Sequence, residues 1–378
     1  MKIVIAGDFF GGGFATNVMS QTVNSFIDSE VISLFKNSDL AMLNLESPLT
    51  KVNKAIKKSG PPIKAPQVVA DRVKEMGINL VTLANNHIMD FGEQGFKDTI
   101  DCLGERGLPF VGAGFNLEHA QRPYIFTVGS EKIAILNFCE NEWSTTHGED
   151  MGANPVHEIN NFYQIQEAKR NADYVLVIAH GGHEHYSLPS PRVKKLYRFY
   201  ADAGANAVVG HHTHCTSGYE VYNKVPIIYS LGNFLFANQA MQSGYWNEGL
   251  IANLEFKNKA CQFALIHINQ CNSEIAVKIA SDEEIKLRHK KLQELNETIL
   301  DDIKLEGAFS KWLESNYKMY RAYLEPHANR YLQYLQNRGL FPSFWHKRKR
   351  VYLMNLLRCE AHRDVVLRLL EDEISHSQ

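Results

Sequence analysis

The stretch "ANAVVGHHTHC", residues 205–215, joins an apolar segment to a cluster of imidazoles. Residues 205–209 are apolar enough for a strand that is covered on both faces of its sheet. His211, His212 and His214 follow at the point where the chain leaves that sheet. A single histidine there is explained by a hydrogen-bonded core side chain. Three within four positions favour a metal site instead, because neutral imidazoles are common metal ligands.

Composition sets the broad class of the protein. A chain of 378 residues is expected to hold more than one structural unit. A net charge of −2 gives no overall attraction for nucleic acid, so we expect no nucleic-acid partner. The six cysteines are scattered without a C-x-x-C pair, which predicts free thiols in a reducing compartment. The N-terminus shows no signal-peptide pattern and no run of 18 apolar residues occurs, so the sequence predicts a cytoplasmic location.

Apolar segments alternate with helical ones through the first 282 residues. The predicted strands cover 2–7, 40–46, 78–84, 132–138, 173–181 and 205–211, and the predicted helices between them cover 66–76, 92–106, 161–171 and 191–203. This alternation favours a layered α/β fold. Three later segments, 225–236, 249–258 and 261–270, are expected to form successive antiparallel strands, with a hairpin turn at 257–259.

The pattern changes near residue 282. Leucine and isoleucine recur at helical spacing after Glu283, and residues 283–378 carry 17 Lys and Arg against 14 Asp and Glu. The first 282 residues have a net charge of about −5. We therefore predict a domain over 1–282 and a helical C-terminal region over 283–378.

Polar side chains collect where the predicted strands end. Ligand sites of α/β sheets lie at the carboxyl ends of strands, so these residues are expected to meet at one rim. Nitrogen and oxygen donors without thiolates suit Zn, Mn, Fe or Ni. The residues in question are Asp8, Asn44, Glu46, Asn85, Asn86, His87, Asp90, His180, His183, Glu184, His185, His211, His212, His214 and Asn233.

Several of these side chains also suit a purely structural role. Asp8 follows a glycine and could cap a helix. Asn86 and Asp90 could be turn formers. His183 and His185 could be surface-loop residues. His211 is the member of its cluster best suited to support a ligand through a hydrogen bond.

Six motifs, in this order, resemble those of the CapA-type capsule and poly-γ-glutamate synthesis proteins, a family of the calcineurin-like metallophosphoesterase superfamily. They are "IAGDFF" (5–10), "LNLESPLT" (43–50), "LANNHIMDFGEQGFKDT" (83–99), "AHGGHEHY" (179–186), "VVGHHTH" (208–214) and "YSLGNFLF" (229–236). The resemblance implies a two-sheet sandwich flanked by helices, with metal between the loops at the strand ends. The helical region after 283 lies outside the resemblance.

Carried over by position, the resemblance implies roles for individual residues. The implied metal ligands are Asp8, Glu46, Asn86, His180, His212 and His214, with Glu46 near the place of a bridging acid. Phe10 stands where the superfamily has a histidine ligand, so one or two divalent ions (Mn, Zn or Fe) are both compatible with the sequence. In the fourth motif, Gly182 and His185 replace the Trp and Tyr that are usual in the CapA type, which leaves the substrate open.

These assignments predict a metal-dependent hydrolase of phosphate esters or anhydrides in surface-polysaccharide or capsule synthesis. His87, Glu184 and Asp90 are the candidate catalytic residues: His87 would protonate the leaving oxygen or hold the phosphoryl group, and Glu184 would orient a ligand or accept a proton. Asn44, His183, His211 and Asn233 are the candidate substrate-binding residues. The expected substrate is a phosphorylated saccharide or a glycerol-phosphate linkage. Two alternatives are a non-catalytic polymer-handling protein and a γ-glutamyl amide hydrolase.

One dense basic run, "WHKRKR" at 345–350, follows the aromatics Phe341 and Phe344. A solvated helix face is the simpler interpretation. The sharper hypothesis is that Lys347–Arg350 contacts an anionic polymer or membrane surface, which would add membrane association to a cytoplasmic enzyme.

Overall fold

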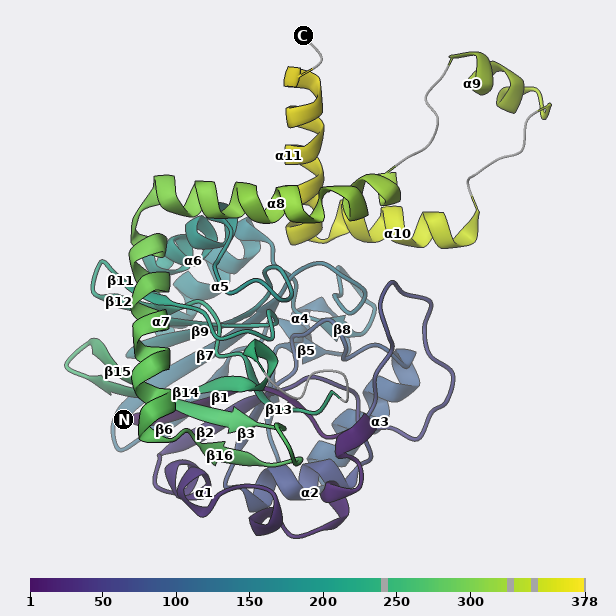
Figure 1. Cartoon of the computed structure of the whole chain (residues 1–378). Helices are drawn as coiled ribbons and strands as arrows, with labels where there is room; N and C mark the ends of the chain where they lie inside the picture. Colours follow the sequence, from purple (N-terminus) through teal and green to yellow (C-terminus); the bar gives the residue numbers. More distant parts are fainter. Residues whose placement is uncertain (239–243, 325–329, 341–345, 377–378) are drawn as a thin grey trace.

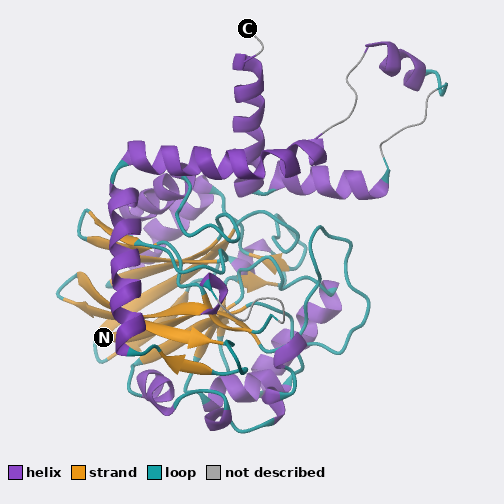
Figure 2. Cartoon of the chain, viewed as in Figure 1, coloured by secondary structure: helices purple, strands orange, loops and turns teal. Residues whose placement is uncertain are grey.

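The computed structural model describes residues 1–238, 244–324, 330–340 and 346–376. Two β-sheets lie face to face, and helices cover their outer faces (Figures 1 and 2). The predicted two-sheet α/β sandwich with C-terminal helices is thus confirmed.

The first sheet follows the order β16-β15-β14-β1-β2-β3-β4, and β13 pairs with β1 beside this path. Its strands are β1 (Lys2–Phe10), β2 (Leu40–Leu45), β3 (Leu80–Thr82), β4 (Phe110–Val111), β13 (Asn233–Phe236), β14 (Glu248–Lys257), β15 (Ala260–Gln270) and β16 (Val277–Ile279). Neighbours from β1 to β4 run parallel, whereas β14 runs antiparallel to both β1 and β15.

The second sheet follows the order β11-β12-β10-β9-β7-β6. Its strands are β6 (Tyr124–Val128), β7 (Glu131–Cys139), β9 (Tyr174–His180), β10 (Ala207–His211), β11 (Tyr219–Tyr222) and β12 (Val225–Ile228), and a separate ribbon pairs β5 (Ala113–Gly114) with β8 (Gly152–Ala153). The central strands β7, β9 and β10 are parallel. Residues of both sheets, among them Ile5, Met42, Leu176 and Ile178, form the buried core between the sheets.

The continuous apolar strands of the sequence are explained by this arrangement, because each central strand is covered on both faces. Helices α1 (Ser29–Lys36), α2 (Val68–Glu75) and α3 (Gly92–Glu105) pack on the outside of the first sheet, and α5 (Glu158–Asn171) and α6 (Pro191–Ala203) pack on the second. The short α4 (Leu117–Ala120) lies beside β5 and β8. Local signals fix α6: the Ser190 side chain accepts a hydrogen bond from Val193 N, Pro191 opens the helix and Gly204, at φ 123°, ends it.

The remaining helices are α7 (Asp282–Leu300), α8 (Asp302–Leu324), α9 (Arg330–Asn337), α10 (Lys347–Arg358) and α11 (Glu360–His376). A reciprocal pair of hydrogen bonds between Ser281 and Glu284 begins α7. Helices α8, α10 and α11 share a core that includes Phe309, Leu356 and Val365. In Figure 1, α8 and α10 lie across the top of the sandwich. Among the described residues, no helix has the length and apolarity needed to cross a membrane.

One sequence prediction is wrong. Residues 225–236 do not form a single strand beside 249–258. The chain changes sheets within this segment: β12 pairs with β10 and β11 in the second sheet, whereas β13 pairs in parallel with β1 in the first. Gly232, at φ 67°, allows the turn between them. The hairpin at 257–259 is confirmed, since Asn258 and Lys259 both have positive φ between β14 and β15. The aromatics Phe341, Phe344 and Trp345 that precede the basic run lie outside the described residues.

Candidate metal centre

Strand register brings the polar strand ends of both sheets to one rim. In the first sheet Asp8 of β1 is paired with Asn44 of β2 on one side and with Asn233 of β13 on the other. In the second sheet His180 of β9 is paired with His211 of β10. All five residues are buried. The rim predicted from the strand ends therefore exists, and both sheets contribute to it.

Asp8 is the centre of the hydrogen bonds at this rim. Its Oδ1 accepts from Asn44 Nδ2 at 2.8 Å and from His211 Nδ1 at 3.0 Å, and its Oδ2 accepts from the backbone N of His212 at 3.1 Å. Burial by itself raises the pKa of the Asp8 carboxyl group, but the His211 hydrogen bond and the nearby imidazoles outweigh it and lower that pKa. Asp8 belongs to β1 and does not cap a helix.

The first donor set consists of Glu46, His180 and His212, whose ligand atoms lie within 4.8 Å of one another. His180 Nε2 is 3.1 Å from His212 Nδ1 and 3.0 Å from Asn86 Oδ1. The other ring nitrogen of His180, Nδ1, lies 3.3 Å from Asn44 Nδ2, so Nε2 is the nitrogen that faces the set. Burial, followed by the neighbouring His212, lowers the pKa of His180, so its imidazole stays neutral as a metal ligand must be.

The second donor set consists of Asp8, Glu46 and His214, again within 4.8 Å. His214 Nδ1 donates to Asn233 Oδ1 at 2.9 Å, so its Nε2 is the nitrogen presented to Glu46, 3.6 Å from Oε1. A hydrogen bond of this kind on the far ring nitrogen fixes the orientation of a ligand histidine. Asn233, predicted as a substrate-binding residue, holds a ligand candidate in place.

Glu46 is common to both sets. Its side chain is fully buried, and Oε1 has no hydrogen-bond partner, while Oε2 accepts from Asn44 Nδ2 at 3.2 Å. Burial and the nearby Asp8 carboxylate raise the pKa of the Glu46 carboxyl group well above its usual range. An unpartnered buried carboxylate oxygen between two sets of neutral and anionic donors is satisfied by a cation. The residues present therefore fit one or two divalent metal ions.

The histidine loop after β10 adopts unusual backbone conformations. His212 has φ 93° and His214 has φ 56°, in the left-handed region that non-glycine residues rarely occupy. Such strain persists where the surroundings enforce it, and it is concentrated at functional sites. Here the backbone turn places the imidazoles of His212 and His214 on the two donor sets.

His87 belongs to a separate buried triad beside the donor sets. Its Nδ1 donates to Asp90 Oδ2 at 2.7 Å, and Asp90 Oδ1 accepts from Lys58 Nζ at 2.6 Å. Burial, followed by the charge of Lys58, lowers the pKa of His87. Asp90 thus orients His87 and is more than a turn former. Lys58, in the loop between β2 and α2, is a residue that the sequence prediction missed.

The loop after β9 carries one buried and one partly exposed residue of the predicted site. His183 is buried, so it is not a surface residue, and its Nε2 donates to the backbone O of Ala361 at 3.0 Å in the C-terminal helices. The Glu184 side chain remains about half exposed. Desolvation by itself raises the pKa of Glu184, but the imidazoles of His212, His214 and His185 outweigh it and lower that pKa to about 2. Glu184 is therefore ionised at neutral pH.

Glu142 is a second residue that the sequence prediction missed. It follows β7, and its Oε1 lies 3.8 Å from His212 Nε2. The side chain is only 11% exposed, so it faces the donor sets from the second sheet. The signal in the sequence is its position shortly after the predicted strand 132–138, the same kind of position that identified the other site residues.

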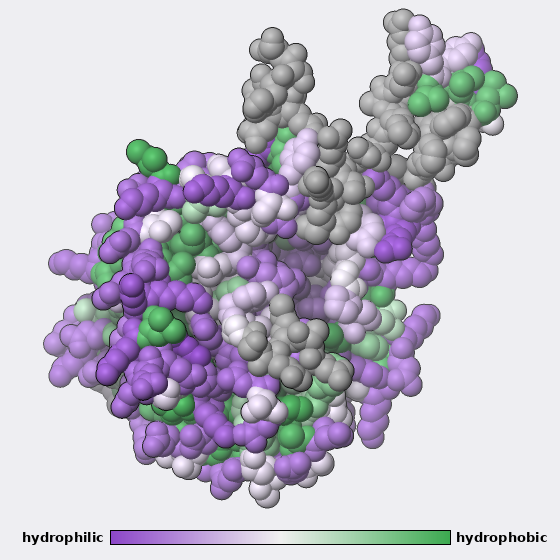
Figure 3. All heavy atoms as spheres, in the orientation of Figure 1, coloured by the Kyte–Doolittle hydropathy of each residue, from purple (hydrophilic) through white to green (hydrophobic). Residues whose placement is uncertain are grey.

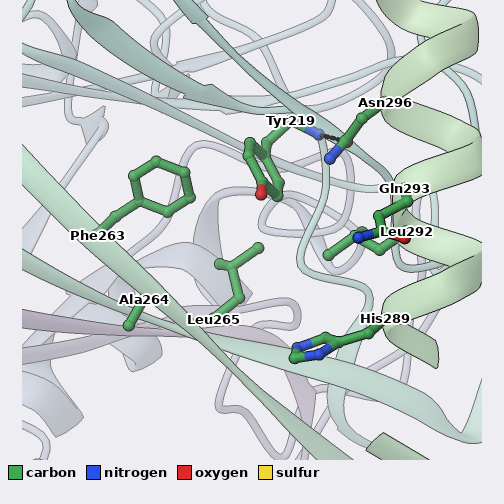
Figure 4. A pocket seen from close by; sticks show the side chains of 8 residues that line it. All are labelled: Tyr219, Phe263, Ala264, Leu265, His289, Leu292, Gln293 and Asn296. Carbon is green, nitrogen blue, oxygen red and sulfur yellow. Dashed lines mark hydrogen bonds between the residues drawn. The ribbon is translucent and has the colours of Figure 1, made fainter. Parts of the chain in front are cut away.

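A pocket of about 330 Å³ lies elsewhere, between α7 and strands β11 and β15 (Figure 4). It is lined by Tyr219, Phe263, Ala264, Leu265, His289, Leu292, Gln293 and Asn296. None of the predicted site residues lines this pocket. On the face shown in Figure 3, hydrophilic side chains predominate over α7 and hydrophobic ones are scattered.

Comparison with known proteins identifies the family. The model of the bacterial capsule synthesis protein family PGA_cap matches residues 2–238. A capsule biosynthesis protein CapA of Bacillus anthracis is 33% identical over 245 residues, which cover 62% of this chain and 60% of that protein. A PGA biosynthesis protein CapA of Bacillus subtilis is 34% identical over 235 residues, covering 61% of this chain and 62% of that protein. The match thus spans about three fifths of each relative. The matched region contains both donor sets and the His87 triad, and the chain belongs to the bacterial capsule synthesis protein family PGA_cap.

Proposed function

We propose that the protein is a divalent-metal-dependent hydrolase that cleaves phosphoric esters or anhydrides during the synthesis of a capsule or of polyglutamate. The observation that carries this proposal is the unpartnered, fully buried Glu46 Oε1, which is shared by two donor sets. Buried polar atoms are almost always hydrogen-bonded, so an orphan carboxylate oxygen among imidazoles favours a bound cation.

The first set offers Glu46, His180, His212 and the Asn86 amide oxygen as ligands, and the second offers Asp8, Glu46 and His214. A bound cation of this kind supplies Lewis acidity to a phosphoryl oxygen and lowers the pKa of water. Carboxylate, amide and imidazole donors without thiolates suit Mn, Zn or Fe.

The protein supplies the proton transfers. His87 is held by Asp90 through Nδ1, and its Nε2 can donate a proton to a leaving oxygen, or hold a phosphoryl oxygen, when the ring is protonated. A bound phosphoryl anion would favour that protonated form against the lowered pKa of His87. Glu184 is ionised and partly exposed, so it can accept a proton from an attacking water. Lys58 adds positive charge beside His87, as an anionic substrate requires.

The biological setting rests on the relatives. Their names place them in capsule and PGA biosynthesis. We propose a phosphorylated saccharide or a glycerol-phosphate linkage as the substrate. We also propose that the largely exposed run Lys347–Arg350 contacts an anionic polymer or membrane surface. Lys347 lies close enough to Lys57, in the loop that also carries Lys58, for the pKa of Lys347 to be lowered.

The test measures hydrolysis and metal content together. Protein purified without chelators is assayed for metal by elemental analysis. It is then incubated with a phosphomonoester, a phosphodiester and polyglutamate side by side, with added Mn²⁺ or Zn²⁺. We expect metal-dependent release of phosphate or alcohol, which Glu46→Gln abolishes and the exposed control Glu118→Gln leaves unchanged. Cleavage of polyglutamate alone would assign an amide hydrolase. Absence of any hydrolysis by metal-loaded protein would contradict the proposal and favour a polymer-handling role.

A further inference from the structure

The first turn of α11 contacts the loop that follows β7. Both carboxylate oxygens of Glu360 are used: Oε2 accepts from the backbone N of Asn141 at 2.8 Å, and Oε1 accepts from Asn141 Nδ2 at 2.6 Å. Glu360 is buried. The next residue after Asn141 is Glu142, which faces His212 of the first donor set. The position of the Glu142 carboxylate thus depends on a residue more than two hundred positions later in the chain.

The same turn contacts the loop that follows β9. The backbone O of Ala361 accepts from His183 Nε2, and the His183 ring packs against Phe309 and Trp312 of α8, with ring centroids 5.2 Å and 4.8 Å away. Glu184, which follows His183, is the partly exposed carboxylate beside His212 and His214. The C-terminal helices therefore hold the residue next to Glu184 on two sides.

Glu140 joins the two loops to each other and to α6. Glu140 accepts from Gly182 N at 3.0 Å through Oε2, and its Oε1 is paired with Arg192 of α6. Arg192 Nε lies 4.0 Å from Oδ2 of Asp364, the fifth residue of α11. The loops also abut directly: a Cβ at Gly181 would lie 2.6 Å from Glu140 Cγ.

The polar contacts at the start of α11 are not needed to attach the C-terminal helices to the sandwich. The apolar cluster of Tyr186, Phe309, Leu313, Leu356 and Val365 already packs α8, α10 and α11 together and onto the β9 loop. The directional polar contacts of the first turn of α11 are additional, and they fall on the two loops that carry Glu142 and Glu184. Buried polar groups add little to the free energy of unfolding, because their pairing mainly offsets the cost of removing them from water. The contribution of these contacts is therefore to fix the geometry of the two loops.

We propose that the first five residues of α11, Glu360–Asp364, are a positioning element of the metal centre, which sets Glu142 and Glu184 against His212. The inference rests on the proposed function for its consequence in catalysis. It goes beyond the family match, because the matched residues end at 238 and α11 begins at 360. The C-terminal region thereby contributes to the site without touching the reacting atoms.

The test uses the full chain with Glu360→Gln, which keeps the size of the side chain but places an amide NH₂ against the Asn141 donors. We expect faster hydrogen exchange in residues 140–146 and 181–187. We also expect Mn²⁺ binding, followed by titration calorimetry, to weaken by about 10-fold, the lower end of what loss of an outer hydrogen bond costs a metal site. The matched control is Glu306→Gln, which removes the ion pair between α8 and Arg368 of α11 and touches neither loop.

A double-mutant cycle separates positioning from general destabilisation. If Glu360 acts through Glu142 and Glu184, Glu360→Gln should have little further effect on Mn²⁺ affinity in a background that carries both Glu142→Gln and Glu184→Gln. Additive losses, or exchange and affinity equal to wild type, would overturn the inference. Glu360→Asp provides the same comparison if Glu360→Gln does not fold. Where hydrolysis is measurable, kcat should fall about 10-fold with KM nearly unchanged. A wild-type protein that binds Mn²⁺ but hydrolyses nothing would refute the proposed function alone, because exchange and metal affinity still decide the positioning role.

Discussion

His211 Nδ1 donates to Asp8 Oδ1 across 3.0 Å, which joins the carboxyl ends of the two sheets through buried side chains. This bond places a strand-end carboxylate of the first sheet against a strand-end imidazole of the second. The two metal donor sets lie around it, because His212 and His214 follow His211 and Glu46 lies beside Asp8. The sandwich therefore places both candidate donor sets where the edges of the two sheets meet.

Glu46→Gln should have opposite effects on metal binding and on the stability of the metal-free protein. Metal content should fall at least about 10-fold, because both donor sets lose their shared carboxylate. The metal-free variant should be more stable than metal-free wild type by about 1–3 kcal/mol, since a neutral amide removes the cost of burying, or of protonating, a carboxyl group whose pKa is raised and whose Oε1 has no hydrogen-bond partner. Elemental analysis and thermal unfolding with and without EDTA measure both quantities. A less stable metal-free variant would show that Glu46 is satisfied without a cation.

His87→Asn should lower the rate of hydrolysis by roughly 10²–10⁴-fold, the usual contribution of a positioned acid or base. Metal content should be unchanged, because His87 bonds to Asp90 and belongs to neither donor set. His119→Asn, on the short helix α4, is the control and should retain full activity. Loss of metal together with activity would place His87 among the ligands.

The sequence predicted those parts of the fold and site that local signals determine. Helix α6 covers 191–203 as predicted, and Ser190, Pro191 and Gly204 mark its ends within the segment itself. The strand-end residues are predicted in the same way, since His180 and His211 are the last residues of buried strands and Asp8 lies two residues before the end of another.

The features that were missed depend on partners far along the chain. The change of sheet between β12 and β13 is set by pairing of Asn233–Phe236 with β1, more than two hundred residues earlier. Lys58 stands in a loop without a strand-end signal and gains its role from Asp90, 32 positions later. His183 is buried by α8 and α11, and the sequence near residue 183 carries no signal for these contacts.

Lowering the pH should destabilise the protein, because His183 is buried in its neutral form. Burial lowers the pKa of His183 to about 3, whereas the unfolded chain has the ordinary value near 6.5. Between these values the unfolded state binds more protons, so this residue's contribution to the free energy of unfolding decreases as the pH is lowered below 6.5. The loss is about 1.4 kcal/mol per pH unit. Urea unfolding at about pH 7 and pH 5 should show a smaller difference for His183→Gln than for wild type. Equal differences would mean that His183 becomes protonated in the folded protein.

The basic run Lys347–Arg350 should bind an anionic surface. These residues occupy the first turn of α10, where the helix dipole disfavours cations, so helix stability does not account for them. Lys57, from the loop between β2 and α2, lies beside Lys347 and extends the same positive charge toward Lys58 and His87. Like charges brought together at a surface attract an anionic partner, and the attraction decreases with salt beyond a Debye length of about 10 Å at 0.1 M.

Changing all four residues of Lys347–Arg350 to Ala should weaken binding to anionic vesicles or to polyglutamate by on the order of 10²–10³-fold at low salt, because each basic residue near such a surface contributes about fivefold. Removing the same charge elsewhere, by changing the exposed Lys286, Lys290, Lys304 and Lys311 to Ala, should have a much smaller effect. Turnover of a small phosphoester should be equal in all three proteins, since none of these lysines and arginines belongs to a donor set. Sedimentation with vesicles and calorimetry with the polymer at two salt concentrations distinguish the two surfaces. If both charge-removed proteins bind alike, the run is a solvated helix face, and if turnover of the small substrate collapses in the first variant alone, α10 contributes to the catalytic site itself.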